Sequence, residues 1–273
     1  MHWALWVGTI LFFYAGVCAF MFFTQERQVF VPPRDWRTTP AEWGLDYESV
    51  QLKSEDHLLS SWFLPGELHK PVVLFFHGNA SNIGDLSDYA RLFHGLGYSS
   101  LLLDYRGYGQ SQGKPSEQGL YQDAQVALAH LVQTRRFKPE RVILFGHSLG
   151  GGPATWLAVH EPVGGLVLEG TFTSIPDRAA QLYPWLPIRM LAHIQFPNLK
   201  NIRDVKLPLL IIHSQEDEII PIEHGRTLYR TAVGDKSMVT TVGPHDGGVE
   251  LNIEAIRNGL IGLEGRMKVY HQQ

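Results

Sequence analysis

Cysteine and charge are both scarce in this sequence of 273 residues. The only cysteine, Cys18, excludes an internal disulfide and says little about the redox compartment. Charged residues make up 18% of the chain and the net charge is −4, with no basic cluster and no motif of stacking aromatic residues. Because binding to nucleic acid depends on clustered positive charge, we expect no nucleic-acid partner.

Metal-binding patterns, internal repeats and low-complexity tracts are also missing. The histidines form neither an H-E-x-x-H motif nor a Cys/His pattern, so we expect no metal ion. Hydrophobic residues, by contrast, make up 44% of the chain, which is enough to bury one large core at this length. The composition therefore predicts one folded domain.

A long apolar run is present near the start of the sequence. From Trp3 to Phe23 there are 21 residues without a charge, close to the ~20 that cross a bilayer as a helix. We predict a membrane anchor at residues 1–24; a cleaved signal peptide is the alternative, but the run lacks a basic start and a small-x-small cleavage site. Arg27, Arg34 and Arg37 follow the run and no Lys or Arg precedes it, which favours a single-pass protein with a cytoplasmic domain.

The rest of the chain is divided by composition. A short proline-containing linker is expected at residues 25–45, a domain at 46–265 and a C-terminal tail at 266–273. Within the domain, apolar segments alternate with helical ones, which predicts an α/β fold with a doubly wound, mostly parallel eight-stranded sheet. The expected strands lie near residues 47–53, 58–64, 72–77, 99–104, 141–146, 165–169, 208–213 and 237–242.

Gly146-His147-Ser148-Leu149-Gly150 directly follows the apolar run 142–145. Apolar residues at helical spacing come next, so the pattern lies between a strand and a helix. This context indicates a nucleophile elbow, in which a strained turn lifts a serine hydroxyl clear of the sheet. We therefore predict that Ser148 is a nucleophile and that the backbone amide of Leu149 is an oxyanion donor.

A nucleophilic serine needs a general base and an acid that orients the base. In this type of site both follow the serine, in the order acid and then histidine. After the expected strand 208–213 come three adjacent carboxylates, and we predict Asp217 as the acid, with Glu216 and Glu218 facing solvent. Glu169, at the end of the preceding strand, is the alternative acid. The turn after the last strand presents His245, the predicted base.

Two further loops follow earlier strands. His77-Gly78-Asn79-Ala80 has small residues that allow the backbone to approach a substrate carbonyl, so we predict the amide of Asn79 as the second oxyanion donor. The loop 104–111 contains glycines and aromatic residues typical of a packed turn. We expect Asp104 and Arg106 to have no direct chemical role.

Together these motifs resemble those of the α/β-hydrolase superfamily, over roughly residues 46 to 265. More narrowly, the chain is similar to membrane-anchored abhydrolase-domain serine hydrolases, a group that includes protein depalmitoylases and hydrolases of lysophospholipids or monoacylglycerols. Two positions depart from the family pattern: Ser214 replaces a usual glycine after the seventh strand, and Pro244 replaces a usual glycine before the catalytic histidine. Neither departure removes Ser148, Asp217 or His245, the predicted catalytic triad.

About forty residues separate the expected strand ending at Glu169 from the next one. Segments of this length in compact domains are usually functional, so we interpret residues 172–205 as a lid insertion. Its apolar side chains are suited to an acyl-chain pocket above the serine, and the alternative is that they pack into the body of the domain. The candidate substrate-binding residues are Phe172, Tyr183, Trp185 and Leu186.

The sequence thus predicts a membrane-anchored serine hydrolase that cleaves ester or thioester bonds of small-molecule or lipid acyl substrates without a cofactor. A serine amidase or peptidase of the same fold is the alternative enzyme. A catalytically silent membrane-bound scaffold is a third interpretation, against which the complete triad argues. The oligomeric state is not indicated.

Overall fold

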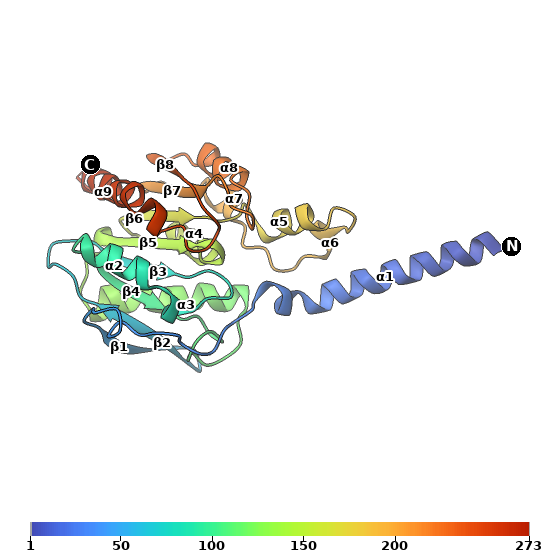
Figure 1. Ribbon diagram of the computed structural model, residues 1–273, viewed down its shortest axis with the longest axis horizontal. Coiled ribbons are helices and arrows are strands. Elements are labelled where there is room, and N and C mark those ends of the chain that lie inside the picture. Colours follow the sequence, from blue (N-terminus) through green and yellow to red (C-terminus); the bar gives the residue numbers. More distant parts are fainter. Residues whose placement is uncertain (1, 273) are drawn as a thin grey trace.

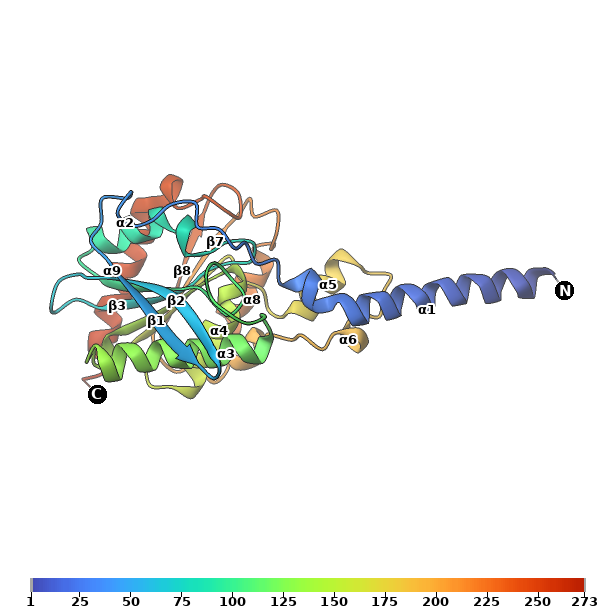
Figure 2. The ribbon, with the colours of Figure 1, turned by 90° about the horizontal axis from the view of Figure 1, so that it is seen from below.

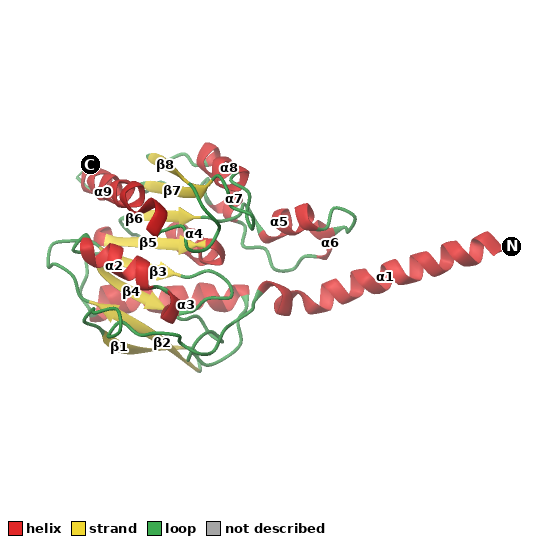
Figure 3. Cartoon of the chain, in the orientation of Figure 1, coloured by secondary structure: helices red, strands yellow, loops and turns green. Residues whose placement is uncertain are grey.

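The computed structural model describes residues 2–272, so residues 1 and 273, which belong to the expected anchor and tail, lie outside the described residues. One long helix, α1 (His2–Val29), extends away from a body in which a sheet lies between two layers of helices (Figure 1). Strands and helices alternate along the body in the order expected for an α/β fold (Figure 3).

The sheet has eight strands in the order β1-β2-β4-β3-β5-β6-β7-β8. The first two pairs in this order are antiparallel and all others are parallel, which confirms the doubly wound, mostly parallel sheet. Each strand lies within one residue of its expected bounds. The strands are β1 (Glu48–Ser54), β2 (His57–Leu64), β3 (Val72–Phe76), β4 (Ser99–Leu103), β5 (Val142–His147), β6 (Gly165–Glu169), β7 (Leu209–Ser214) and β8 (Lys236–Thr241).

Helices cover both faces of this sheet (Figure 2). One face carries α2 (Ser87–Gly95) and α9 (Ile253–Tyr270). The other carries α3 (Glu117–Ala129), α4 (Gly151–His160) and α8 (Glu223–Thr231). The insertion between β6 and β7 contains three short helices, α5 (Ile175–Leu182), α6 (Ile188–Leu191) and α7 (Asn198–Asn201).

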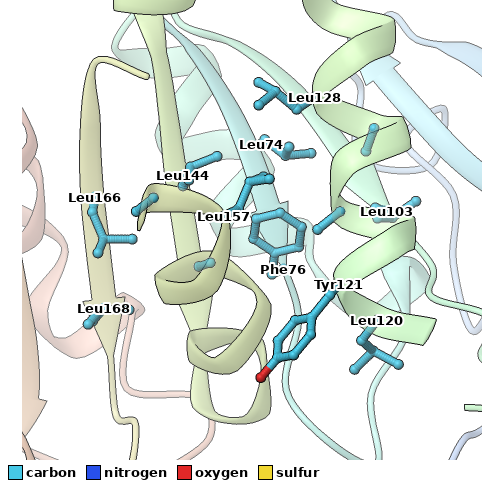
Figure 4. Packing of buried hydrophobic residues seen from close by; sticks show 14 of the residues in the cluster. Leu74, Phe76, Leu103, Leu120, Tyr121, Leu128, Leu144, Leu157, Leu166 and Leu168 are labelled. Atoms are coloured by element: carbon cyan, nitrogen blue, oxygen red, sulfur yellow. The ribbon is translucent and has the colours of Figure 1, made fainter. Parts of the chain in front are cut away.

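The central strands are buried on both sides because they lie between two helical layers, which explains their continuous apolar sequences. Leu74, Phe76 and Leu144 point toward α3 and α4 (Figure 4). Phe75 and Phe145 point to the opposite layer, where their rings stack with centroids 5.0 Å apart. Since parallel strands end at the same edge of the sheet, this core brings the loops after β3, β5, β7 and β8 together.

The segment 25–45 is not a separate linker. Helix α1 continues to Val29, and the chain after it packs on the body, with Phe30 and Trp43 buried. The Trp36 indole N–H donates a hydrogen bond of 2.7 Å to the Asp104 carboxylate. The expectation of a linker was wrong because its aromatic side chains find partners in loops distant in sequence, and the packed segment fixes where α1 leaves the domain.

The expected boundary at residue 265 falls inside α9, which ends at Tyr270. Met267 is buried and continues the apolar face formed by Leu260 and Leu263 for one more turn. Residues 266–270 therefore belong to the last helix rather than to a tail.

Candidate active site

Ser148 lies on a sharp turn between β5 and α4. Its φ of 52° is in the left-handed region, which costs energy for any residue except glycine and is typical of a functional strained position. A Cβ on Gly146 or Gly150 would collide with backbone atoms, those of Gly150 itself and of Phe76 respectively. The strand, the flanking glycines and the backbone strain give the geometry of a nucleophile elbow.

The structure brings Ser148, His245 and Asp217 together from the loops after β5, β8 and β7. His245 Nε2 lies 2.9 Å from Ser148 Oγ, and His245 Nδ1 lies 2.8 Å from Asp217 Oδ2. The backbone N–H groups of Ile219 and Ile220 donate to Asp217 Oδ1 at 3.0 and 2.7 Å. The carboxylate is thus held in place on one oxygen and faces the imidazole with the other.

Electrostatics in this cluster favour a charged carboxylate beside a basic imidazole. Burial alone would raise the pKa of Asp217, but hydrogen bonds from His213, His245 and the Ile220 amide hold it well below its usual range. Burial alone would lower the pKa of His245, but its hydrogen bond to Asp217 and the charge of that carboxylate raise it above its ordinary value. The imidazole is therefore a stronger base than free histidine.

The two flanking glutamates hold the acid loop and the histidine loop together. The backbone N–H of Gly243 donates to Glu216 Oε2 at 2.8 Å, and that of His245 donates to Glu218 Oε2 at 3.1 Å. Both glutamates are exposed, as expected, but they also have this tethering contact. The Ser214 hydroxyl adds another link, since it donates to the Gly243 carbonyl. Serine at this position thus supports the loop geometry.

Both expected oxyanion donors lie beside Ser148. Asn79 and Leu149 line the same cavity as the serine. The Asn79 side chain is fixed because its Oδ1 accepts hydrogen bonds from the Val31 N–H at 2.9 Å and the Tyr108 hydroxyl at 2.8 Å. Among residues 2–272, no acceptor pairs with the backbone N–H of Asn79. This amide is therefore open to a substrate oxygen.

Glu169, the alternative acid, has a different partner. Its Oε2 accepts a hydrogen bond of 2.7 Å from the Tyr89 hydroxyl. Burial is the main influence on its carboxyl group and raises its pKa to about 7. The histidine nitrogen that faces a carboxylate is bonded to Asp217, so the geometry favours Asp217 over Glu169 as the orienting acid.

Asp104 and Arg106 have structural partners. Arg106 Nη2 lies 2.7 Å from Asp123 Oδ1, in a buried ion pair that joins the loop after β4 to α3. Asp104 accepts hydrogen bonds from the Trp36 indole and from the Ile83 backbone N–H. Neither residue lines the cavity at Ser148, which agrees with a packed turn.

A cavity of about 430 Å³ opens above Ser148. Phe172 and Tyr183 line it, as expected, but Trp185 and Leu186 do not. Trp185 is 58% exposed and contacts Tyr14 of α1, and Leu186 is buried away from the cavity. Their assignment to the pocket was wrong because sequence does not show which face of an irregular segment turns inward. The insertion both lines the pocket and packs on the body, so neither interpretation of it holds alone.

The end of α1 forms a second wall of this cavity, which the sequence did not indicate. Its contributing residues come from the last three turns of the helix, next to the insertion: Met21, Gln25, Gln28 and Val29. The remaining apolar lining comes mainly from α5 and α6, through Ile175, Ala179, Leu182, Ile188 and Leu191. The cavity thus lies between the body, the insertion and α1.

One group of potential metal ligands lies near the triad. Ligand atoms of His147, His245 and Asp246 are within 4.8 Å of one another. Both ring nitrogens of His245 already face Ser148 and Asp217, so a metal would have to displace one of these contacts. The donor set therefore suits the triad better than a metal.

Comparison with known proteins gives consistent findings. Residues 67–201 match the family described as serine aminopeptidase, S33. The chain is 34% identical to alpha/beta hydrolase domain-containing protein WAV2 of Arabidopsis thaliana, covering 84% of this chain and 82% of that protein. It is 32% identical to the lysophosphatidylserine lipase ABHD12 of Danio rerio, over 74% of this chain and 56% of that one. A Pyrococcus furiosus esterase, Pf2001, has the same fold, with a TM-score of 0.73, 21% identity and coverage of 86% and 98%.

Proposed function

The chain belongs to the α/β-hydrolase family, and from this we propose that it is a membrane-anchored serine hydrolase that cleaves ester or thioester bonds of acyl-chain substrates. The observation that carries the proposal is the continuous set of contacts from Asp217 through His245 to Ser148, at 2.8 and 2.9 Å. The positive φ of Ser148 supports the same conclusion, since strain of this kind accumulates at functional sites.

In the proposed mechanism, Ser148 Oγ attacks the substrate carbonyl while His245 Nε2 takes the hydroxyl proton. The carbonyl oxygen becomes negative and is held by the backbone amides of Asn79 and Leu149. Collapse of this intermediate expels the alcohol or thiol, which receives the proton from His245, and leaves an acyl group on Ser148. Water then attacks the acyl-enzyme with the same base, releases the fatty acid and restores the serine. Asp217 orients the imidazole and stabilises its positive charge.

The cavity supports an acyl chain as the group transferred. Its walls are mainly apolar, and each methylene that it removes from water is worth about 0.8 kcal/mol. A relative of this chain is named a lysophosphatidylserine lipase, which is consistent with a single-chain lipid substrate, although the chain spans just over half of that protein. No cofactor takes part in the proposed chemistry.

A chain-length series tests this assignment. For soluble p-nitrophenyl esters, kcat/KM is expected to rise with acyl length until the cavity is full, because longer chains bury more methylenes in the transition state. Leu182 lines the cavity, so Leu182→Ser should flatten this rise while leaving the shortest ester unchanged. Leu68→Ser is the control, since Leu68 is 82% exposed in the loop before β3, at the opposite edge of the sheet.

A flat or falling profile in the wild-type protein would contradict the acyl-chain assignment. Peptide and amide substrates run beside the esters test the alternative enzyme, a serine amidase or peptidase, which the same triad supports. A preference for peptide bonds would select that alternative and leave the triad unchanged.

The activity should depend on pH through His245. Only the neutral imidazole takes a proton, so kcat/KM should fall as pH decreases through the pKa of His245. Because Asp217 raises this pKa, the midpoint should lie above the ordinary value of about 6.5. In Asp217→Asn the raising charge is lost and the midpoint of the residual activity should move to lower pH. A midpoint that stays in place or moves upward would contradict the coupling.

We further propose that α1 crosses the membrane once and places the catalytic domain on the cytoplasmic side. Residues Leu5–Val29 are long and apolar enough to span a bilayer, and none of their apolar window is buried in the protein. Arg27 lies at the end of this stretch and Arg34 and Arg37 follow it, which supports the orientation. Proteolysis of the domain in sealed vesicles distinguishes the two faces, since only a domain on the outer surface of the vesicle is cut.

A further inference from the structure

The insertion leaves the body on the same side as α1 and runs beside it (Figure 1, Figure 2). Gln25 of α1 joins the two: its Nε2 donates to the Leu191 carbonyl at 2.7 Å, and its Oε1 accepts from the His193 N–H at 2.9 Å. Closer to the start of α1, the Tyr14 hydroxyl donates to the Trp185 carbonyl at 2.9 Å. The insertion is thus fastened to α1 at two separate levels.

These two levels differ in depth along the proposed membrane helix. Gln25 directly precedes the first charged residue of α1, Glu26, so the membrane surface lies near this position. Tyr14 is 11 residues earlier, which at 1.5 Å per residue corresponds to about 16 Å along the axis. The hydrocarbon core of a bilayer is ~30 Å thick. The contact with Trp185 therefore lies well below the headgroups.

Residues 183–190, here called the insertion tip, have a surface suited to lipid. Trp185 is 58% exposed and Met190 is 86% exposed, and Tyr183 is exposed beside them. Arg189 is the only charged residue of the tip, and its guanidinium pairs at 3.0 Å with Asp177 in the first turn of α5. An apolar surface of this kind, next to a membrane helix, is costly in water and favourable in the bilayer.

The backbone of the tip is also adapted to an apolar environment, where an unpaired polar group is costly. Pro184 and Pro187 have no N–H, and the Trp185 carbonyl accepts the hydrogen bond from Tyr14. Further N–H groups donate to carbonyls inside the insertion: those of Tyr183, Leu186, Ile188 and Met190. This pairing, together with the shelter of α1 alongside, reduces the cost of placing an irregular segment in the interior of a membrane.

We propose that the insertion tip lies in the bilayer leaflet beside α1, and that acyl chains enter the Ser148 cavity from this leaflet, between the two. The walls of the cavity agree with such an entrance, since Met21 and Gln25 of α1 line it together with Tyr183 and Ile188 of the insertion. This inference rests on the proposed function, in which α1 spans the membrane and Ser148 is the nucleophile. It specifies the substrate as an acylated molecule resident in the bilayer.

Depth-dependent quenching of a fluorophore tests the location of the tip. In a full-length Cys18→Ser background, Met190→Cys is labelled with an environment-sensitive NBD group and reconstituted into phosphatidylcholine vesicles. A nitroxide on the lipid acyl chains should quench this label strongly. Phe13→Cys, 67% exposed on α1, is the positive control, and Leu68→Cys, at the opposite edge of the sheet, is the negative control.

The outcomes distinguish insertion of the tip from anchoring by α1. Quenching at positions 190 and 13 but not at 68 supports insertion of the tip. Quenching at 13 without quenching at 190 overturns it and leaves the anchor intact. Absence of quenching at 13 overturns the anchor and the insertion together. Labelling of Ser148 by a fluorophosphonate in detergent reports on the catalytic site, independently of the quenching at positions 13, 68 and 190.

An activity measurement tests the entrance itself. Trp185→Asp places a charge in the tip without altering the cavity lining, so turnover of a long-chain lysophospholipid in vesicles should fall about tenfold or more. Hydrolysis of a short soluble ester should not change. Leu68→Asp is the matched control and should leave both activities unchanged. Equal rates of Trp185→Asp and wild type on the vesicle substrate would overturn entry from the leaflet.

Discussion

Replacing Ser148 with alanine is expected to lower kcat by roughly 10⁴–10⁶. The serine Oγ is the atom that forms the proposed covalent bond, and it lies 2.9 Å from the base. Without it, His245 and the oxyanion amides have no nucleophile on which to act. The measurement is hydrolysis of a soluble ester by purified wild-type and variant protein, with thermal unfolding recorded for both.

The strained backbone at residue 148 requires a second variant. Alanine keeps the unfavourable φ of 52°, whereas glycine adopts it freely. Ser148→Gly should therefore be as inactive as Ser148→Ala and at least as stable. Activity within tenfold of wild type in either folded variant would contradict the role of Ser148. An inactive wild type that also fails to react with a fluorophosphonate would favour the silent scaffold.

Asp217→Asn is expected to lower kcat by on the order of 10⁴, whereas Glu169→Gln should have a small effect. Asp217 is the carboxylate 2.8 Å from His245 Nδ1, and asparagine in its place no longer compensates the charge that the imidazole gains. Glu169 instead accepts a hydrogen bond from Tyr89, and a glutamine oxygen can still accept it. The measurement is kcat/KM of both variants on the same ester.

These two carboxylates form a matched pair, because Glu169 ends β6, Asp217 lies in the loop after the neighbouring parallel strand β7, and neither side chain is exposed. A loss of activity caused only by lower stability would therefore be expected in both variants, Asp217→Asn and Glu169→Gln. The assignment of the acid is contradicted when Glu169→Gln is the damaging substitution and Asp217→Asn is mild. Comparable losses in both would point to a shared electrostatic role rather than to one orienting acid.

The local patterns of the sequence were sufficient for the sheet and for the placement of Ser148, Asp217 and His245. Buried parallel strands leave continuous apolar runs, so all eight strands could be located within one residue. Ser148 was identified by the glycines that its turn requires. Asp217 and His245 follow strands that end at the same edge, and the structure brings both within hydrogen-bond distance in the predicted order.

The contacts between distant segments could not be predicted in the same way. Trp36 finds Asp104 and Phe30 finds the core only because of the tertiary fold, so segment 25–45 looked like a linker. Trp185 and Leu186 looked like pocket residues because composition does not reveal which way a short irregular segment turns. The wall supplied by the end of α1 left no local signal, since its residues lie at the end of the apolar run or directly after it and form no motif.

The role of Ser148 as nucleophile is tested most directly by locating a covalent adduct. Full-length protein in detergent is treated with a fluorophosphonate, digested and analysed by mass spectrometry. We expect one modified residue, Ser148, and no modification when His245 is replaced by alanine, because the serine then lacks its base. An adduct on another residue, or none in the wild-type protein, would contradict the proposed mechanism.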